Sequence, residues 1–180
     1  MPRINPLNHE VASEESKDLF GQVQKKLGRV PNLMQSLGHS PAALGGYLSL
    51  NESLSRGVLD TKDRERIALT VAEYHGCGYC AAAHSAIGSM VGLTEAQIHE
   101  ARRGISDDPK VESLLRFVHR VLDSKGHVED ADLDSFRSAG YSEAAVAEVV
   151  AHVSLNVLTN FFNSVAETEI DFPQAKVLAS

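Results

Sequence analysis

Apolar residues recur along most of the chain at the three- and four-residue spacing of helices, and no stretch alternates convincingly in the manner of a strand. The clearest stripe runs from Val111 to Leu122, behind Pro109, which suits the first turn of a helix. Earlier stripes predict helices that end near Gly28 and Gly57. The pattern therefore indicates an all-α protein, a single-domain helical bundle.

Capping and helix-breaking residues delimit the other elements. Asp60 and Thr61 open a helix that reaches about Tyr74, after which Gly76 and Gly78 interrupt the pattern. Further helices are predicted from about Cys77 to Val91, from Thr94 to Arg103, from Asp130 to Gly140 and from Ser142 to about Val165. Because no linker or repeat separates the predicted helices, residues 1–180 are expected to form one domain with its core at about 13–173.

The last predicted helix is apolar on more than one face. Either it lies at the centre of the bundle or part of it faces another subunit, and a homo-oligomer (dimer, trimer or hexamer) is expected. Its apolar run is interrupted by Glu148, His152, Asn156, Asn160 and Asn163. A lipid-facing span would have to bury all of them, so no membrane partner is predicted.

Composition excludes some classes of partner. The chain has 180 residues, of which 43% are hydrophobic and 23% charged, and its net charge is −7. That acidic balance argues against nucleic acid. Because the first residues carry no basic segment followed by an apolar one, we expect a cytoplasmic location with reduced thiols. Arg102 and Arg103 are interpreted as part of a solvated face.

The two cysteines, Cys77 and Cys80, are the strongest chemical signal. A disulfide across so short a loop would constrain the unfolded chain little, which favours a chemical role. In a helix that starts near Cys77, both sulfurs and His84 share one face. The helix N-terminus favours a thiolate at Cys77, whereas His84, a base one turn away, favours deprotonation of Cys80. We weigh the base more heavily, so Cys80 is the predicted nucleophile and Cys77 the resolving cysteine.

A counting argument adds a carboxylate. If residues 62–74 and 78–91 form a hairpin, positions equidistant from its turn meet, and this pairs Glu65 with His84. Glu65 could orient the imidazole or take its proton. Glu73, nearer the turn, is a further candidate, although a solvated surface carboxylate is favoured for it.

Less specific interpretations of the cysteine pair stay open. The two could be small buried apolar residues, or they could bind zinc with His84 and a fourth ligand from His75, Glu65 or His152. A c-type haem site would need a histidine directly after Cys80, and a thioredoxin fold would need strands beside the motif. His152 itself is interpreted as a satisfied core or interface residue.

Two asparagines of the last helix, Asn156 and Asn160, are expected to bond helix ends or a neighbouring subunit. No glycine-rich nucleotide motif or phosphate loop is visible, so no cofactor is predicted and electrons are expected to come from an external thiol or dithiol.

The segment from Glu65 to His84 resembles the active-site signature of the alkylhydroperoxidase D family, within the carboxymuconolactone decarboxylase-like superfamily. The residues from Leu27 to Leu33, with Ser40-Pro41, resemble the N-terminal region of its peroxidase-related branch. The resemblance continues from Asn156 to Asn163 and from Thr168 to Pro173, and so covers most of the chain.

The resemblance implies an all-α fold, obligate oligomers and a thiol peroxidase or disulfide reductase activity. It implies that Cys80 attacks the hydroperoxide, that Cys77 resolves, and that Glu65 and His84 relay protons. The best-known members have a second histidine just before the second cysteine, where this chain has Tyr79. Tyr79 is a poor base near pH 7, so part of that relay is expected to be missing.

Three hypotheses for function follow. The first is a hydroperoxide reductase supplied with electrons by a thiol or a thiol protein. The second is a non-catalytic redox sensor or disulfide reductase in which the cysteine pair toggles. The third is a structural zinc module.

Overall fold

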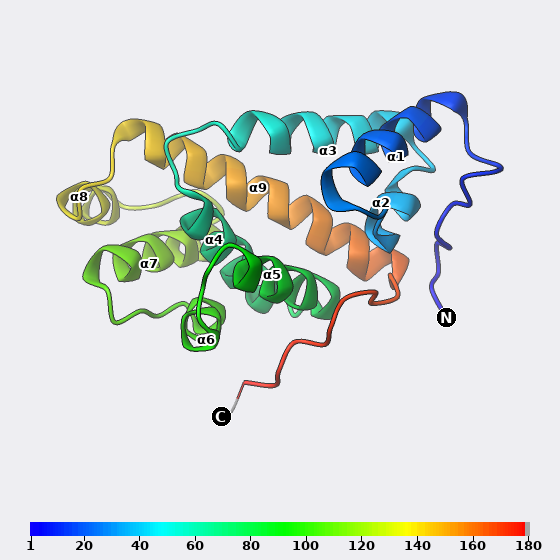
Figure 1. Ribbon diagram of the computed structural model, residues 1–180. Helices are drawn as coiled ribbons and strands as arrows, with labels where there is room; N and C mark the ends of the chain where they lie inside the picture. The colour runs from blue at the N-terminus through cyan, green and yellow to red at the C-terminus, as the bar shows by residue number, and fades with distance from the viewer. Residues whose placement is uncertain (179–180) are drawn as a thin grey trace.

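The computed structural model describes residues 1–178, and within them the chain forms nine α-helices and no strand (Figure 1). The all-α prediction is therefore confirmed. The helices are α1 (Glu14–Leu27), α2 (Asn32–Leu37), α3 (Pro41–Leu54), α4 (Thr61–Tyr74), α5 (Gly78–Met90), α6 (Glu95–Arg103), α7 (Pro109–Asp123), α8 (Asp130–Ser138) and α9 (Glu143–Ala166).

Capping residues explain where most helices begin. The side chain of Asp60 accepts a hydrogen bond from the Asp63 N–H, and Thr94 and Gln97 form a complete capping box. At α8 the N-cap is Glu129, one residue earlier than predicted, since Asp132 returns its side chain to the Glu129 N–H. The sequence pattern missed α2 because six residues are too few to show a periodic stripe.

Helix α4 occupies the centre of the molecule and packs against α5, α6, α7 and α9. Ile67 and Val71 of α4 belong to a core cluster that also contains an aromatic stack from α7, α8 and the residues after α8. Phe117 lies 4.5 Å from Phe136, which in turn lies 4.3 Å from Tyr141, measured between ring centroids. This packed side holds α4 in place and leaves its other face free to carry the site.

Helix α9 is the longest element and crosses the bundle between α3 and α7 (Figure 1). Its 24 residues are long and apolar enough to cross a membrane, but it packs on α3, α4, α5 and α7, as a core helix does. The opposite face exposes an apolar stripe at Val150, Leu158, Phe161 and Val165. The helix is thus central, with one face left for a neighbour, and the homo-oligomer stays a prediction.

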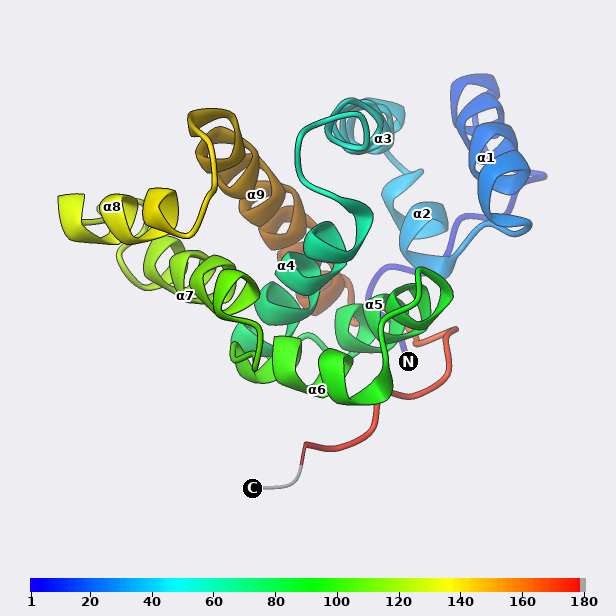
Figure 2. The ribbon, with the colours of Figure 1, turned by 60° about the vertical axis from the view of Figure 1, so that its left-hand side comes forward.

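The C-terminal segment after α9 passes the beginning of α5 (Figure 2). Asp171 and Phe172 contact Tyr79 there, and Lys176 lies beside Arg102 of α6. This strap, residues 170–178, forms one wall of the region around the cysteines.

Candidate functional site

The cysteines lie in a hairpin made by α4 and α5. Helix α4 ends at Tyr74, and Gly76 turns the chain with φ +64°, a backbone conformation that glycine adopts without strain. The Cys77 N–H then donates to the Ala72 carbonyl at 2.9 Å. The hairpin brings together the residues that the counting argument paired: Nδ1 of His84 lies 2.8 Å from Oε2 of Glu65.

Cys77 and Cys80 are joined by a disulfide, with 5.3 Å between their Cα atoms. Cys77 is the N-cap of α5, which confirms that this helix starts near Cys77. Both residues are buried, with 5% and 3% of their surfaces exposed. His84 follows Cys80 by four residues on the same helix, which places it one turn further along.

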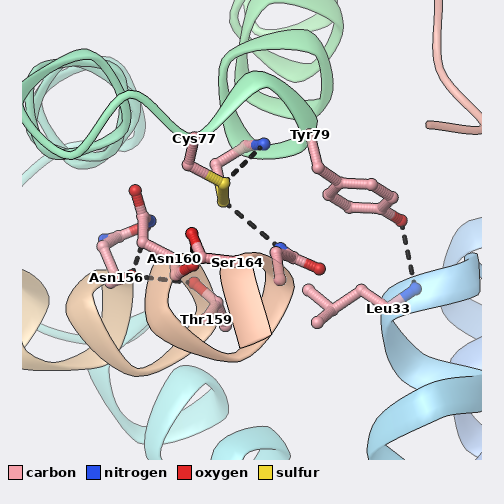
Figure 3. Close-up of a disulfide and its surroundings, with 9 residues drawn as sticks. Leu33, Cys77, Tyr79, Asn156, Thr159, Asn160 and Ser164 are labelled. Carbon is pink, nitrogen blue, oxygen red and sulfur yellow. Dashed lines mark hydrogen bonds between the residues drawn. A yellow bond between two sulfur atoms is a disulfide. The ribbon is translucent and has the colours of Figure 1, made fainter. Parts of the chain in front are cut away.

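Each sulfur accepts one hydrogen bond. The Cys80 N–H donates to Sγ of Cys77 at 3.2 Å, and Nδ2 of Asn163 donates to Sγ of Cys80 at 3.3 Å (Figure 3). Donors of this kind stabilise a thiolate when the disulfide is reduced. The arrangement therefore supports negative charge on either sulfur, from the helix N-terminus at Cys77 and from α9 at Cys80.

Asn163 is the site residue that sequence reasoning missed. The available signal was a row of polar residues on an apolar helix: His152, Asn156, Asn160 and Asn163 are spaced by four, four and three, which puts them on one face of α9. All four are buried. We call these residues the polar row, and Figure 3 shows its Asn156 and Asn160 on the side of α9 that faces the cysteines.

The amides of Asn156 and Asn160 do not bond helix ends. Each donates to a carbonyl one turn earlier in α9, at 2.8 and 2.6 Å, and contact with a neighbouring subunit stays a prediction. His152 lies in the core, as one of the two predicted alternatives has it. His152 is not satisfied, because its Nε2 is buried without a hydrogen-bond partner. Burial lowers the pKa of His152 below its usual 6.5, so the imidazole is neutral at pH 7.

Tyr79, considered as a stand-in for the family's histidine, is engaged elsewhere. Its hydroxyl donates to Oδ1 of Asp171 at 2.8 Å and accepts from the Leu33 N–H at 3.2 Å. Oδ2 of Asp171 in turn pairs with Arg29 at 2.9 Å. Burial raises the pKa of Tyr79. Figure 3 shows its ring directed toward Leu33 and away from the sulfurs, so Tyr79 ties α5 to α2 and the strap.

Glu73 and Arg102 also differ from their predicted roles. Arg102 is buried, with 8% of its surface exposed, and is not part of a solvated face. Its guanidinium pairs with Glu73 at 2.9 Å and donates to the Lys176 carbonyl at 2.6 Å. Glu73 is therefore a partner of Arg102 rather than a free surface carboxylate.

Two cavities flank the hairpin. A polar chamber of about 60 Å³ is lined by Glu65 and His84 together with His152 and Asn156 of the polar row. A larger pocket of about 380 Å³ is lined by Cys77, by the Glu73–Arg102 pair and by the strap. We call the first the polar chamber and the second the strap pocket. Cys77 thus faces the strap pocket, while the imidazole one turn beyond Cys80 faces the polar chamber.

The predicted zinc ligands do not converge. Among residues 1–178 no group of three or more His, Cys, Asp or Glu side chains is placed to hold a metal ion. The two sulfurs are bonded to each other, and His84 is paired with Glu65. The zinc hypothesis therefore has no support in this arrangement.

Comparisons with known proteins agree with the fold. Residues 41–122, which include the hairpin, match the carboxymuconolactone decarboxylase family. A peroxidase-related protein from Ralstonia eutropha JMP134, described as an alkylhydroperoxidase AhpD core, superposes with a TM-score of 0.86 at 20% identity, over 94% of this chain and 92% of that one. No match was found among curated protein sequences.

Two further solved structures have the same fold. A peroxidase-related protein from Silicibacter sp. TM1040 gives a TM-score of 0.80 at 22% identity, covering 92% of this chain and 91% of that one. The debrominase Bmp8, solved in complex with 2,3,4-tribromopyrrole, gives a TM-score of 0.78 at 21% identity, covering 93% of this chain and 91% of that one.

Within residues 1–178, the nine helices and the hairpin form an all-α fold of the alkylhydroperoxidase D-like type. The match to the carboxymuconolactone decarboxylase family is confined to residues 41–122, which hold the hairpin, and the likeness to the solved structures over the rest of the chain is one of fold.

Proposed function

We propose that the protein is a thiol-dependent peroxidase that reduces hydroperoxides through Cys80 and Cys77. The observation that carries the proposal is the environment of Cys80. Its sulfur lies within bonding distance of the resolving cysteine, accepts a hydrogen bond from Asn163, and is one helical turn from an imidazole that Glu65 holds at 2.8 Å.

In the first step, His84 takes the proton of the Cys80 thiol, and the thiolate attacks the distal oxygen of the hydroperoxide. The O–O bond breaks, and the alcohol or water leaves with the proton that His84 returns. Cys80 becomes a sulfenic acid. Glu65 keeps the imidazole oriented and stabilises its protonated form.

In the second step, the Cys77 thiol gives up its proton and its sulfur attacks the sulfur of the sulfenic acid. The displaced hydroxide takes up that proton and leaves as water, and the disulfide seen in this structure forms. An external dithiol then reduces it, and one hydroperoxide is consumed for each dithiol oxidised. Of the two cysteines, Cys77 is the one that lines the strap pocket, so we expect the dithiol to attack there. Attack there would release Cys80 as a thiolate beside Asn163.

The physiological setting follows from this chemistry. Each turnover needs a thiol or thiol protein that stays reduced, which agrees with the cytoplasmic location expected from the sequence. The cycle as written uses no metal or organic cofactor.

A second candidate is a disulfide reductase or redox sensor in which Cys77 is the nucleophile. Cys77 caps α5, receives the Cys80 N–H and faces the strap pocket, which is the arrangement of an attacking thiolate at a helix N-terminus. In this role the pair would exchange with another disulfide and turn over no hydroperoxide.

Trapping separates the two candidates. The pre-reduced Cys77→Ser variant should form a sulfenic acid on Cys80 when hydrogen peroxide is added, detected by dimedone labelling and mass spectrometry. The matched Cys80→Ser variant should remain unlabelled at Cys77. The opposite labelling pattern would assign attack to Cys77, and absence of label in both variants together with intact thiols in the wild type would refute the peroxidase.

A further inference from the structure

The two ends of the polar row of α9 contact different parts of the site. Asn163 donates to the Cys80 sulfur, and His152 and Asn156 line the polar chamber next to Glu65 and His84. The buried face of α9 thus joins the chamber to the reacting sulfur. On α5, His84 likewise lies between the chamber and Cys80: it lines the chamber and is one helical turn from Cys80.

Three polar atoms of this row have no hydrogen-bond partner although they are buried: Nε2 of His152, Oδ1 of Asn160 and Oδ1 of Asn163. Such atoms are rare in native proteins, where nearly every buried polar group is paired with protein, water or ligand. His152 is the most informative, since it is 4% exposed and lines the chamber. A small molecule with both O–H donors and oxygen acceptors would satisfy the two amide oxygens and the ring nitrogen.

The size of the chamber limits what it can hold. A water molecule needs about 10–15 Å³ of such space. The chamber has about 60 Å³, which accommodates a molecule of a few non-hydrogen atoms, whereas a long alkyl or aromatic group would have to extend out of it. Its lining is mostly polar, with Tyr47, Asn51 and Arg64 completing the walls.

We propose that the polar chamber is the binding site for hydrogen peroxide and hydroperoxides of similar size, and that His152 positions them for transfer along the polar row to Cys80. Hydrogen peroxide carries an O–H donor at each end, which matches a row of acceptors. Bulky organic hydroperoxides do not fit this route. The inference rests on the proposed peroxidase function and adds a substrate class and a positioning residue to it.

The test measures the rate at which hydroperoxides oxidise the pre-reduced protein, followed by the loss of thiols in a stopped-flow instrument. The wild type should react with hydrogen peroxide at least about tenfold faster than with cumene hydroperoxide. His152→Leu should slow the oxidation by hydrogen peroxide about tenfold. His152→Gln, which keeps a polar group, should restore most of that rate. Ser113→Ala, which alters an unpaired buried hydroxyl outside the row, should match the wild type.

A structural effect of His152 would be seen in a second readout. Alkylation of the reduced thiols by iodoacetamide should stay within about twofold of wild type in His152→Leu, since the substitution leaves Glu65, His84 and Asn163 in place. Equal rates for the two hydroperoxides in the wild type, or an unchanged peroxide rate in His152→Leu, would overturn this inference alone. A wild type that reacts with neither hydroperoxide would refute the proposed function as well.

Discussion

At the scale of single residues, Asn163 contributes most directly to the chemistry proposed for Cys80. Its amide is the one side-chain donor to that sulfur among the hydrogen bonds of the described residues. A hydrogen bond to a charged group contributes about 1.5–3 kcal/mol, and 1.36 kcal/mol corresponds to one pKa unit. Asn163 should therefore stabilise the thiolate form of Cys80 when the disulfide is reduced.

Replacing Asn163 by leucine should disfavour the thiolate form of Cys80 relative to the thiol, because it removes the Nδ2 donor. The thiolate fraction at pH 7 falls accordingly, and the rate of oxidation by hydrogen peroxide should drop about tenfold. The pKa is measured from the pH dependence of iodoacetamide alkylation in a Cys77→Ser background. Thr159→Val is the matched control, because the Thr159 hydroxyl donates within α9 to the Asn156 carbonyl. An unchanged alkylation profile would contradict the role of Asn163.

Contacts between single residues could be predicted from the sequence where one local turn determines them. Glu65 and His84 are 19 residues apart, but a single hairpin determines that they meet. Arg102 was assigned to a solvated face because its partners lie far along the chain: Glu73 is 29 residues away and Lys176 is 74. Asn163 lies 83 residues from Cys80, and only the packing of α9 on α5 brings the two together.

At the scale of elements, the hairpin and the strap act together. Tyr79 and Asp171 are 92 residues apart, and their hydrogen bond holds the beginning of α5 against the strap. Arg29 stacks on Phe172 at 4.3 Å and pairs with Asp171, which extends the tie to the residues before α2. No sequence pattern links these positions, since none of them belongs to a periodic stripe.

Tyr79→Phe should destabilise the fold and leave the chemistry intact. The substitution keeps the ring and removes the hydroxyl, which leaves the Leu33 N–H without its acceptor. A loss of about 1–3 kcal/mol lowers Tm by about 2–12 °C in a domain of this size. The rate of Cys80 oxidation should stay within about twofold of wild type.

The control for Tyr79→Phe is Tyr74→Phe at the end of α4, where the tyrosine is 42% exposed. Thermal melting and stopped-flow oxidation are measured on both variants. A tenfold loss of oxidation rate in Tyr79→Phe with an unchanged Tm would mean that Tyr79 carries protons in place of the family's histidine.

At the scale of the whole molecule, the helical pattern was sufficient to predict the class of fold. The long stripes of α7 and α9 set the core, and the capping signals at Asp60, Thr94 and Ser142 set helix starts. The helical pattern could not predict the short helix α2 or the course of the strap, because both depend on contacts across the bundle. The exposed stripe of α9 is the surface through which we expect copies of the chain to associate.

The central claim is that one hydroperoxide converts one dithiol to the Cys77–Cys80 disulfide. The measurement is a titration of the pre-reduced wild-type protein with hydrogen peroxide, counting free thiols and remaining peroxide in the same samples. We predict that two thiols are lost from each chain for each peroxide consumed, and that a dithiol restores both. Thiols that stay reduced under millimolar peroxide, or a loss of one thiol per chain, would contradict the account.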